Sequence, residues 1–265
     1  MYEFNSFSLI DAPEPCAIVF VKGCPLSCKY CYNIELRKVS SGLNLIEIIT
    51  NISKLQDINP SGEKYNTVDW IIFSGGEPFP QMPGFKQIFS KDSNTISRDT
   101  LYLLNLAKDK GFKTGIYTIG LSKYFKEAIK ENLLDFVNID YKHFSLESVE
   151  IHKRERANYF VSAYLKIIME NIQEAYSSYS DSRLEYLYLN TVLCKSTHNK
   201  DTFKIMREWV DKTIPDIPIF LKRDFSKKLG WILTPFFNDN NKISTLGNLT
   251  SNEIIPDSEV ESWLI

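Results

Sequence analysis

The chain has 265 residues, of which 43% are hydrophobic and 24% are charged, an ordinary composition for a globular protein with a sizeable core. Its net charge of −2 and the lack of a Lys/Arg block argue against a nucleic-acid-binding protein. Near the N-terminus, the longest apolar run, Cys16–Val21, is far shorter than the roughly 20 residues of a membrane span. Met1–Asn5 lacks the basic and apolar regions of a signal peptide, so we expect a cytoplasmic protein without a membrane segment.

Short apolar runs alternate with longer amphipathic segments along the chain. The runs are mostly continuous, which favours parallel strands covered on both faces. The expected strands are Ala17–Val21, Val68–Phe73, Lys113–Tyr117, Phe136–Ile139, Glu185–Val192 and Ile217–Leu221. The expected helices are Leu45–Leu55, Arg98–Lys110, Ser122–Glu131, Arg156–Tyr176 and Lys200–Asp211.

Local signals indicate where some of these helices begin and end. Asn44 and Ser97 are of the residue types that cap helix N-termini, so we expect them to begin the first two helices. Gly111 follows a charged helical turn and predicts the end of the second helix.

The strand–helix unit repeats about six times, which predicts an α/β fold with a parallel sheet and right-handed crossovers. A closed eight-unit barrel takes about 250 residues. Here only about 205 residues carry the pattern, and the chain turns polar and irregular after about Gly230. We therefore expect a partial, open parallel β/α barrel of about six units over 1–224. Residues 225–265 are expected to form a C-terminal tail or a small appended element.

Three of the five cysteines, Cys24, Cys28 and Cys31, lie within eight residues, directly after the first expected strand. In a reducing compartment, grouped cysteines indicate metal or cluster ligation rather than disulfides. A [4Fe–4S] cluster normally takes four thiolates, so three leave one iron open to a cosubstrate. This arrangement suits the reductive cleavage of S-adenosylmethionine (SAM).

A structural zinc site is the alternative reading of these cysteines. Such a site needs four ligands, and the fourth is not evident. Cys16 begins an expected strand and has the character of a core residue, while Cys194, His143, His152 and His198 are distant in sequence.

The spacing Cys24-x3-Cys28-x2-Cys31, with Tyr30 before the third cysteine, resembles the signature of the radical SAM superfamily. The resemblance implies one [4Fe–4S] cluster, SAM as cosubstrate and Tyr30 near the adenine. The wider stretch from Ser8 to Leu36 resembles the activating enzymes of glycyl radical enzymes, especially those of anaerobic ribonucleoside-triphosphate reductase.

A second candidate motif, Ser74-Gly75-Gly76-Glu77, ends the second expected strand and precedes Pro78. Paired glycines allow the backbone to approach a ligand closely, and a carboxylate can accept hydrogen bonds from an ammonium group. The alternative is a tight turn with a solvent-facing Glu. The motif is similar to the GGEP element of the superfamily, which implies that it holds the amino group of SAM.

Asn138, Asp140 and Lys142 share one face of the fourth expected strand, because side chains alternate along a strand. Polar groups there need partners, which the mouth of a barrel would supply, although an exposed strand end is the alternative. In the activating enzymes a D-x-K pair at this place contacts SAM. The resemblance therefore implies that role for Asp140 and Lys142.

The side chain of Asn190, on the fifth expected strand, either faces SAM or is an ordinary residue of the core or rim of the fold. His198, in the loop that follows, is either a SAM-side histidine of the kind that related activases carry or a surface residue at a helix start. Ile119 departs from the family pattern, which commonly has a polar residue there.

The resemblance implies an activase. A flavodoxin or ferredoxin would reduce the cluster, and the radical from SAM would remove a hydrogen from a glycine of a partner glycyl radical enzyme. The cluster and SAM carry this chemistry, so no acid–base residue is expected. Two alternatives stay open. One is a radical SAM enzyme acting on a small molecule, such as a deazaguanine precursor, or on a peptide. The other is a non-catalytic iron–sulfur or zinc protein.

Overall fold

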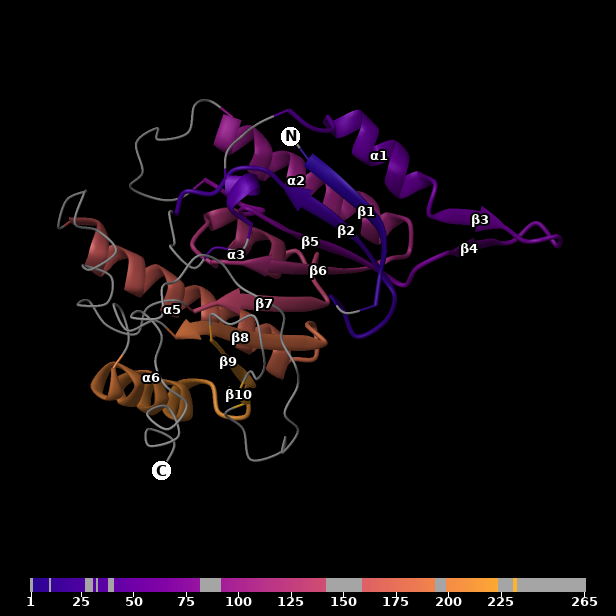
Figure 1. Cartoon of the computed structure of the whole chain (residues 1–265). Coiled ribbons are helices and arrows are strands. Elements are labelled where there is room, and N and C mark those ends of the chain that lie inside the picture. The colour runs from indigo at the N-terminus through magenta and orange to yellow at the C-terminus, as the bar shows by residue number, and fades with distance from the viewer. Residues whose placement is uncertain are drawn as a thin grey trace.

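The computed structural model describes residues 2–9, 11–26, 31, 33–37, 41–81, 92–141, 159–193, 199–223 and 231–232. Its main feature is an eight-stranded sheet (Figure 1). The strands in spatial order are β1 (Tyr2–Ser8), β2 (Cys16–Val21), β5 (Trp70–Gly75), β6 (Lys113–Thr118), β7 (Phe136–Asp140), β8 (Tyr186–Leu193), β9 (Ile219–Arg223) and β10 (Trp231–Ile232).

The six strands from β2 to β9 are parallel to one another, whereas β1 and β10 pair antiparallel at the two edges. Within the described residues β1 and β10 do not pair with each other, so the sheet is open. The predicted α/β class with an open parallel sheet of six units is thereby confirmed. The bounds of all six predicted strands agree with the structure within two residues.

Five described helices connect or follow the strands: α1 (Leu45–Ser53), α2 (Asp92–Asp109), α3 (Lys123–Lys130), α5 (Tyr159–Ser180) and α6 (Lys200–Thr213). Each corresponds to a predicted helix. All five place buried residues in one core cluster, so they cover one face of the sheet. In Figure 1, α1 and α2 lie toward the β1 edge, and α6 lies toward the β10 edge.

The helix ends test two of the predicted caps. Asn44 caps α1 as expected, since its side chain accepts from the N–H of Glu47 at 3.0 Å. Ser97 does not cap α2, because the helix already begins at Asp92. The Ser97 hydroxyl instead donates to Ser93 O at 2.9 Å, a bond to the preceding turn that exists only inside a helix.

Four of the described strands were not predicted. They are the edge strand β1, the short strand β10 and a hairpin of β3 (Gln56–Ile58) and β4 (Lys64–Asn66), which projects from the body in Figure 1. Of the predicted C-terminal element at 225–265, only Trp231–Ile232 is described, and it pairs with β9. None of the described helices is long and apolar enough to span a bilayer.

The face of the sheet opposite the helices carries a second, aromatic cluster. Phe136 is at its centre, with ring centroids 6.4 Å from Trp70, 5.7 Å from Tyr188 and 5.5 Å from Tyr117. Gly115 makes room for this packing, because a Cβ there would lie 2.8 Å from the Phe136 ring. We call this surface the inner face of the sheet.

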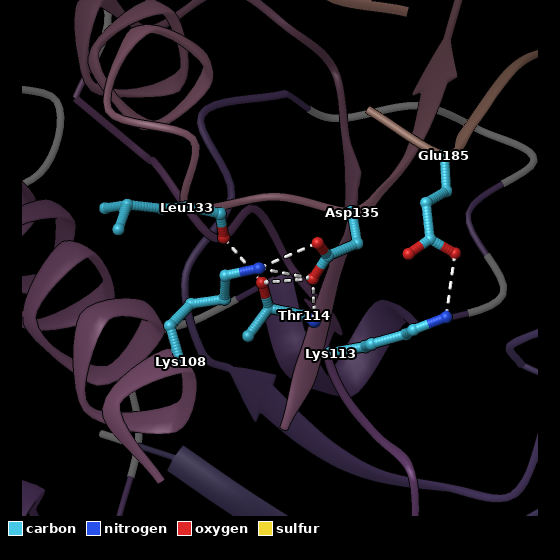
Figure 2. Close-up of polar contacts among 6 residues, drawn as sticks. All are labelled: Lys108, Lys113, Thr114, Leu133, Asp135 and Glu185. Carbon is cyan, nitrogen blue, oxygen red and sulfur yellow. Dashed lines mark hydrogen bonds and ion pairs between the residues drawn. The ribbon is translucent and has the colours of Figure 1, made fainter. Parts of the chain in front are cut away.

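At the amino ends of the strands, Asp135 links one helix to three strands, and Figure 2 shows the contacts of its carboxylate. Its carboxylate accepts from Lys108 Nζ at 2.7 and 2.9 Å and from the N–H of Thr114 at 2.7 Å. Its carbonyl oxygen accepts from the N–H groups of Glu185 and Tyr186. Asp135 thus ties α2 to the beginnings of β6, β7 and β8, at the end of the sheet opposite the predicted site.

Candidate cofactor site

The cysteine loop and the glycine pair meet at the carboxyl ends of β2 and β5. These strands are parallel neighbours whose last paired residues are Val21 and Gly75. Beyond the strands, the N–H of Gly76 donates to Val21 O and the N–H of Glu77 donates to Gly23 O, both at 2.8 Å. The two loops are therefore joined backbone to backbone directly before Cys24.

A short 3-10 helix, η1 (Ile34–Arg37), closes the cysteine loop on its other side. The N–H of Gly23 donates to Leu36 O at 2.8 Å, and the N–H of Cys24 donates to Arg37 O at 3.0 Å. The side chain of Asn33 donates to Gly75 O at 3.1 Å. Both ends of the loop that carries the cysteines are thereby fixed to the ends of the sheet.

The paired glycines serve this close approach of backbones. Gly75 has φ of 110°, a left-handed conformation, and a Cβ on it would lie 2.6 Å from Val21 O. A Cβ on Gly76 would strike Gly23 O and would lie 2.7 Å from Leu36 O. Glycine is therefore required at both positions by the chain's own backbone contacts, and the predicted role of this loop in SAM binding stays a prediction.

Among the predicted cluster ligands, Cys24 and Cys31 are described, and Cys28 lies outside the described residues. Both described thiols are partly buried and form no disulfide. Cys16, by contrast, is fully buried in the aromatic cluster, and burial raises the pKa of its thiol to about 11. A thiol held protonated in this way is a poor cluster ligand, in line with the core role predicted for it. The described part of the loop therefore fits a site with thiolate ligands.

Glu77 is almost completely buried, with 1% of its surface exposed. Its carboxylate accepts from the hydroxyl of Thr118 at 2.6 Å and from the N–H groups of Ile119 at 2.8 Å and Phe79 at 3.2 Å. The solvent-facing Glu of the alternative reading is therefore wrong. The carboxylate joins the loop after β5 to the end of β6, through the backbone of Ile119, the residue that departs from the family pattern.

Burial raises the pKa of Glu77 to about 7. The three hydrogen bonds oppose this shift because they stabilise the ionised form, and the charge of Asp140 adds a smaller upward contribution. This effect of Asp140 shows that the ends of β5 and β7 bring two carboxylates within electrostatic range of each other.

Asp140 and Asn190 are register partners at the carboxyl ends of β7 and β8. Asp140 is partly buried, whereas Asn190 is 2% exposed and donates through Nδ2 to Oδ1 of Asn138. All three residues lie on the inner face, above the aromatic cluster. Lys142, Tyr30 and His198 lie outside the described residues.

Sequence reasoning missed several residues of this arrangement. The hydroxyl of Thr118, which donates to Glu77, gave no signal because the two residues are 41 positions apart in the sequence. The N–H of Ile119 gave none because a backbone donor has no sequence signature. Asn138 was placed on the correct face but was given no partner, since its bond to Asn190 depends on the register of two strands. Asn33 lies within the Ser8-to-Leu36 stretch that carries the resemblance, but its bond to Gly75 was not foreseen.

Comparison with known proteins places this site in a family context. Residues 15–109 match the family described as the 4Fe–4S single cluster domain, a range that includes the three cysteines and Ser74–Glu77. A Methanocaldococcus jannaschii protein, named as a provisional glycyl-radical enzyme activating enzyme, is 30% identical over 166 residues, 61% of this chain and 58% of that protein. The pyruvate formate-lyase-activating enzyme of Clostridium pasteurianum is 29% identical over 146 residues, 54% of this chain and 52% of that enzyme.

Among solved structures, coproporphyrinogen III oxidase from Escherichia coli, described as a radical SAM enzyme, matches with a TM-score of 0.42 and 11% identity. The match covers 74% of this chain and 38% of that chain. The chain spans somewhat more than half the length of the two activating enzymes. The 4Fe–4S domain match implies an iron–sulfur cluster. The predicted resemblance is confirmed, since this chain matches a 4Fe–4S single cluster domain and is similar to proteins named as activating enzymes of a glycyl-radical enzyme and of pyruvate formate-lyase.

Proposed function

We propose that this protein is a radical SAM enzyme that generates a glycyl radical on a partner enzyme. The observation that carries the proposal is the junction of the cysteine loop and the Gly75–Glu77 loop at the carboxyl ends of two adjacent parallel strands. Sites of β/α proteins lie at this end of the strands. The similarity to glycyl-radical enzyme activating enzymes supports the choice of reaction.

Cys24, Cys28 and Cys31 would hold the cluster, with one iron left for SAM. When bound, the cluster would supply the electron that splits SAM into methionine and a 5′-deoxyadenosyl radical. The protein's part is to place and shield the reactants. The bonds from Gly23 and Cys24 to η1 hold the start of the loop, and the bond from Asn33 to Gly75 holds its end.

The SAM-binding residues in this proposal are Ser74 to Glu77, Asp140, Lys142 and Asn190, with Tyr30 beside the adenine. Asp140 supplies a carboxylate for the positive charge of SAM. Glu77 already accepts three bonds from the chain, so its carboxylate also fixes the loop that surrounds the bound amino group. A cytoplasmic location and a flavodoxin or ferredoxin as reductant complete the proposal.

The test uses anaerobically reconstituted protein with SAM and a chemical reductant. The expected result is slow formation of 5′-deoxyadenosine. With a glycyl radical enzyme encoded beside this gene, formation should be faster, and a glycine-centred doublet should appear in the partner's electron paramagnetic resonance spectrum. Zinc as the only bound metal after anaerobic isolation would refute the cluster. A small molecule that accelerates SAM cleavage in proportion to its own conversion, with no radical on any partner, would refute the activase assignment.

A further inference from the structure

Two asparagines lie side by side on the inner face, between the aromatic cluster and the ends of the strands. Asn138 is on β7 and Asn190 is on β8, and they are 6% and 2% exposed. Toward the amino ends of the strands, the Phe136 and Tyr188 rings pack with centroids 5.7 Å apart and close the space beneath them. Toward the carboxyl ends, the register partner of Asn190 is Asp140. The amide pair therefore forms a polar layer directly above an apolar one.

The hydrogen bond between the two amides has a direction. Nδ2 of Asn190 donates to Oδ1 of Asn138, so the carboxamide of Asn190 cannot turn over without losing this bond. Oδ1 of Asn190 is buried, and within the described part of the chain it accepts no hydrogen bond. Folded proteins leave few buried acceptors unsatisfied, and each such atom calls for a partner.

We infer that Asn138 is a positioning residue, which holds Asn190 so that its Oδ1 accepts a hydrogen bond from a hydroxyl or N–H group of the adenosyl part of SAM. The inference rests on the proposed function, because it concerns the same cofactor site. A neutral amide oxygen suits a neutral donor, whereas the ammonium group of SAM is better matched by a carboxylate such as Asp140. Asn138 itself need not touch SAM, since it acts through the orientation of Asn190.

The experiment measures SAM affinity of the cluster-loaded enzyme by titration followed by electron paramagnetic resonance. Asn138→Leu removes the acceptor that orients Asn190, and SAM should bind about 3- to 10-fold more weakly, the range expected for one neutral hydrogen bond. Asn138→Asp keeps an oxygen in the same place and should stay within about 2-fold of the wild type. Asn190→Leu should weaken binding as much as Asn138→Leu, and the double variant no more than either single one.

Thermal unfolding of each variant separates this role from a general loss of packing. If Asn138→Asp and Asn138→Leu melt at the same temperature but only Asn138→Asp keeps the SAM affinity of the wild type, the result supports positioning. Asn138→Ala replaces Asn138→Leu if the Leu variant does not fold. Three outcomes would overturn the inference while leaving the proposed function intact. They are wild-type SAM affinity in Asn138→Leu, a loss of SAM affinity in Asn138→Asp equal to that in Asn138→Leu, and single losses that multiply in the double variant. Failure of the wild type to bind SAM would overturn both.

Discussion

Replacing Asp135 by Asn is expected to destabilise the fold without touching the candidate site. The change removes the charge that accepts two hydrogen bonds from Lys108 Nζ, and it sets an amide donor against the ammonium group. The carboxylate also accepts from the N–H of Thr114 at 2.7 Å, and an amide retains only one oxygen for these partners. A hydrogen bond to a charged group contributes about 1.5–3 kcal/mol.

The burial of the two side chains determines how much stability Asp135→Asn loses within that range. The side chain of Asp135 is 14% exposed and that of Lys108 is 31% exposed, so solvent screens the pair only in part. We expect a loss of about 2 kcal/mol in the free energy of unfolding. For a chain of this size the melting temperature should fall by about 4–8 °C.

A matched control lies beside this pair in Figure 2, where Lys113 Nζ meets Glu185 at 2.9 Å. The nitrogen–oxygen distances are similar, but both side chains of the control are more than 40% exposed, at 43% and 41%. Exposed pairs contribute about 0–1 kcal/mol, so Glu185→Gln should change the stability little. Thermal and urea unfolding followed by circular dichroism would measure both variants. Equal losses in the two variants, or less than about 0.5 kcal/mol for Asp135→Asn, would refute the reasoning from burial.

Three further predictions concern the candidate site. Cys28→Ala should abolish the cluster absorption at about 400 nm in reconstituted protein, whereas Cys16→Ala should retain it. A cluster in both variants would contradict the ligand assignment. Gly76→Ala should lose about 1–3 kcal/mol of stability, because its Cβ would strike backbone atoms. Gly62→Asn should be tolerated, since nothing lies within 4 Å of a Cβ there. Similar unfolding curves for the two variants would contradict this reasoning. Folding raises the pKa of Glu77 from 4.5 to about 7, so the folded state favours the protonated carboxyl. In the cluster-free chain, the contribution of Glu77 to the free energy of unfolding is therefore greatest below pH 4.5. It falls by about 3 kcal/mol as the pH rises from 4.5 through about 7. Glu77→Gln should remove this fall, and urea titrations at several pH values that show the same slope in both proteins would argue against it.

The elements of the sheet could be predicted where their signals are local. Continuous apolar runs such as Cys16–Val21 become buried parallel strands, and the cap at Asn44 lies within the turn that it begins. Ser97 was misplaced for a physical reason. The residue types that cap a helix also occur inside one, where the hydroxyl bonds to the preceding turn, and only the full length of α2 distinguishes the two cases. The strand β1 escaped prediction because it is an edge strand with mostly exposed side chains, which has no apolar run to mark it.

The sequence by itself determined the chemistry available at the site, since the type and spacing of Cys24, Cys28 and Cys31 and of Ser74–Glu77 are properties of the chain. That these two segments meet was decided by the pairing of β2 with β5, which brings residues about fifty positions apart into adjacent loops. The contact of Glu77 with Thr118 on β6 and the bond between Asn138 and Asn190 were likewise decided by strand register. A slip of one residue would turn each of these side chains to the opposite face, so only the packed sheet determines which of them meet.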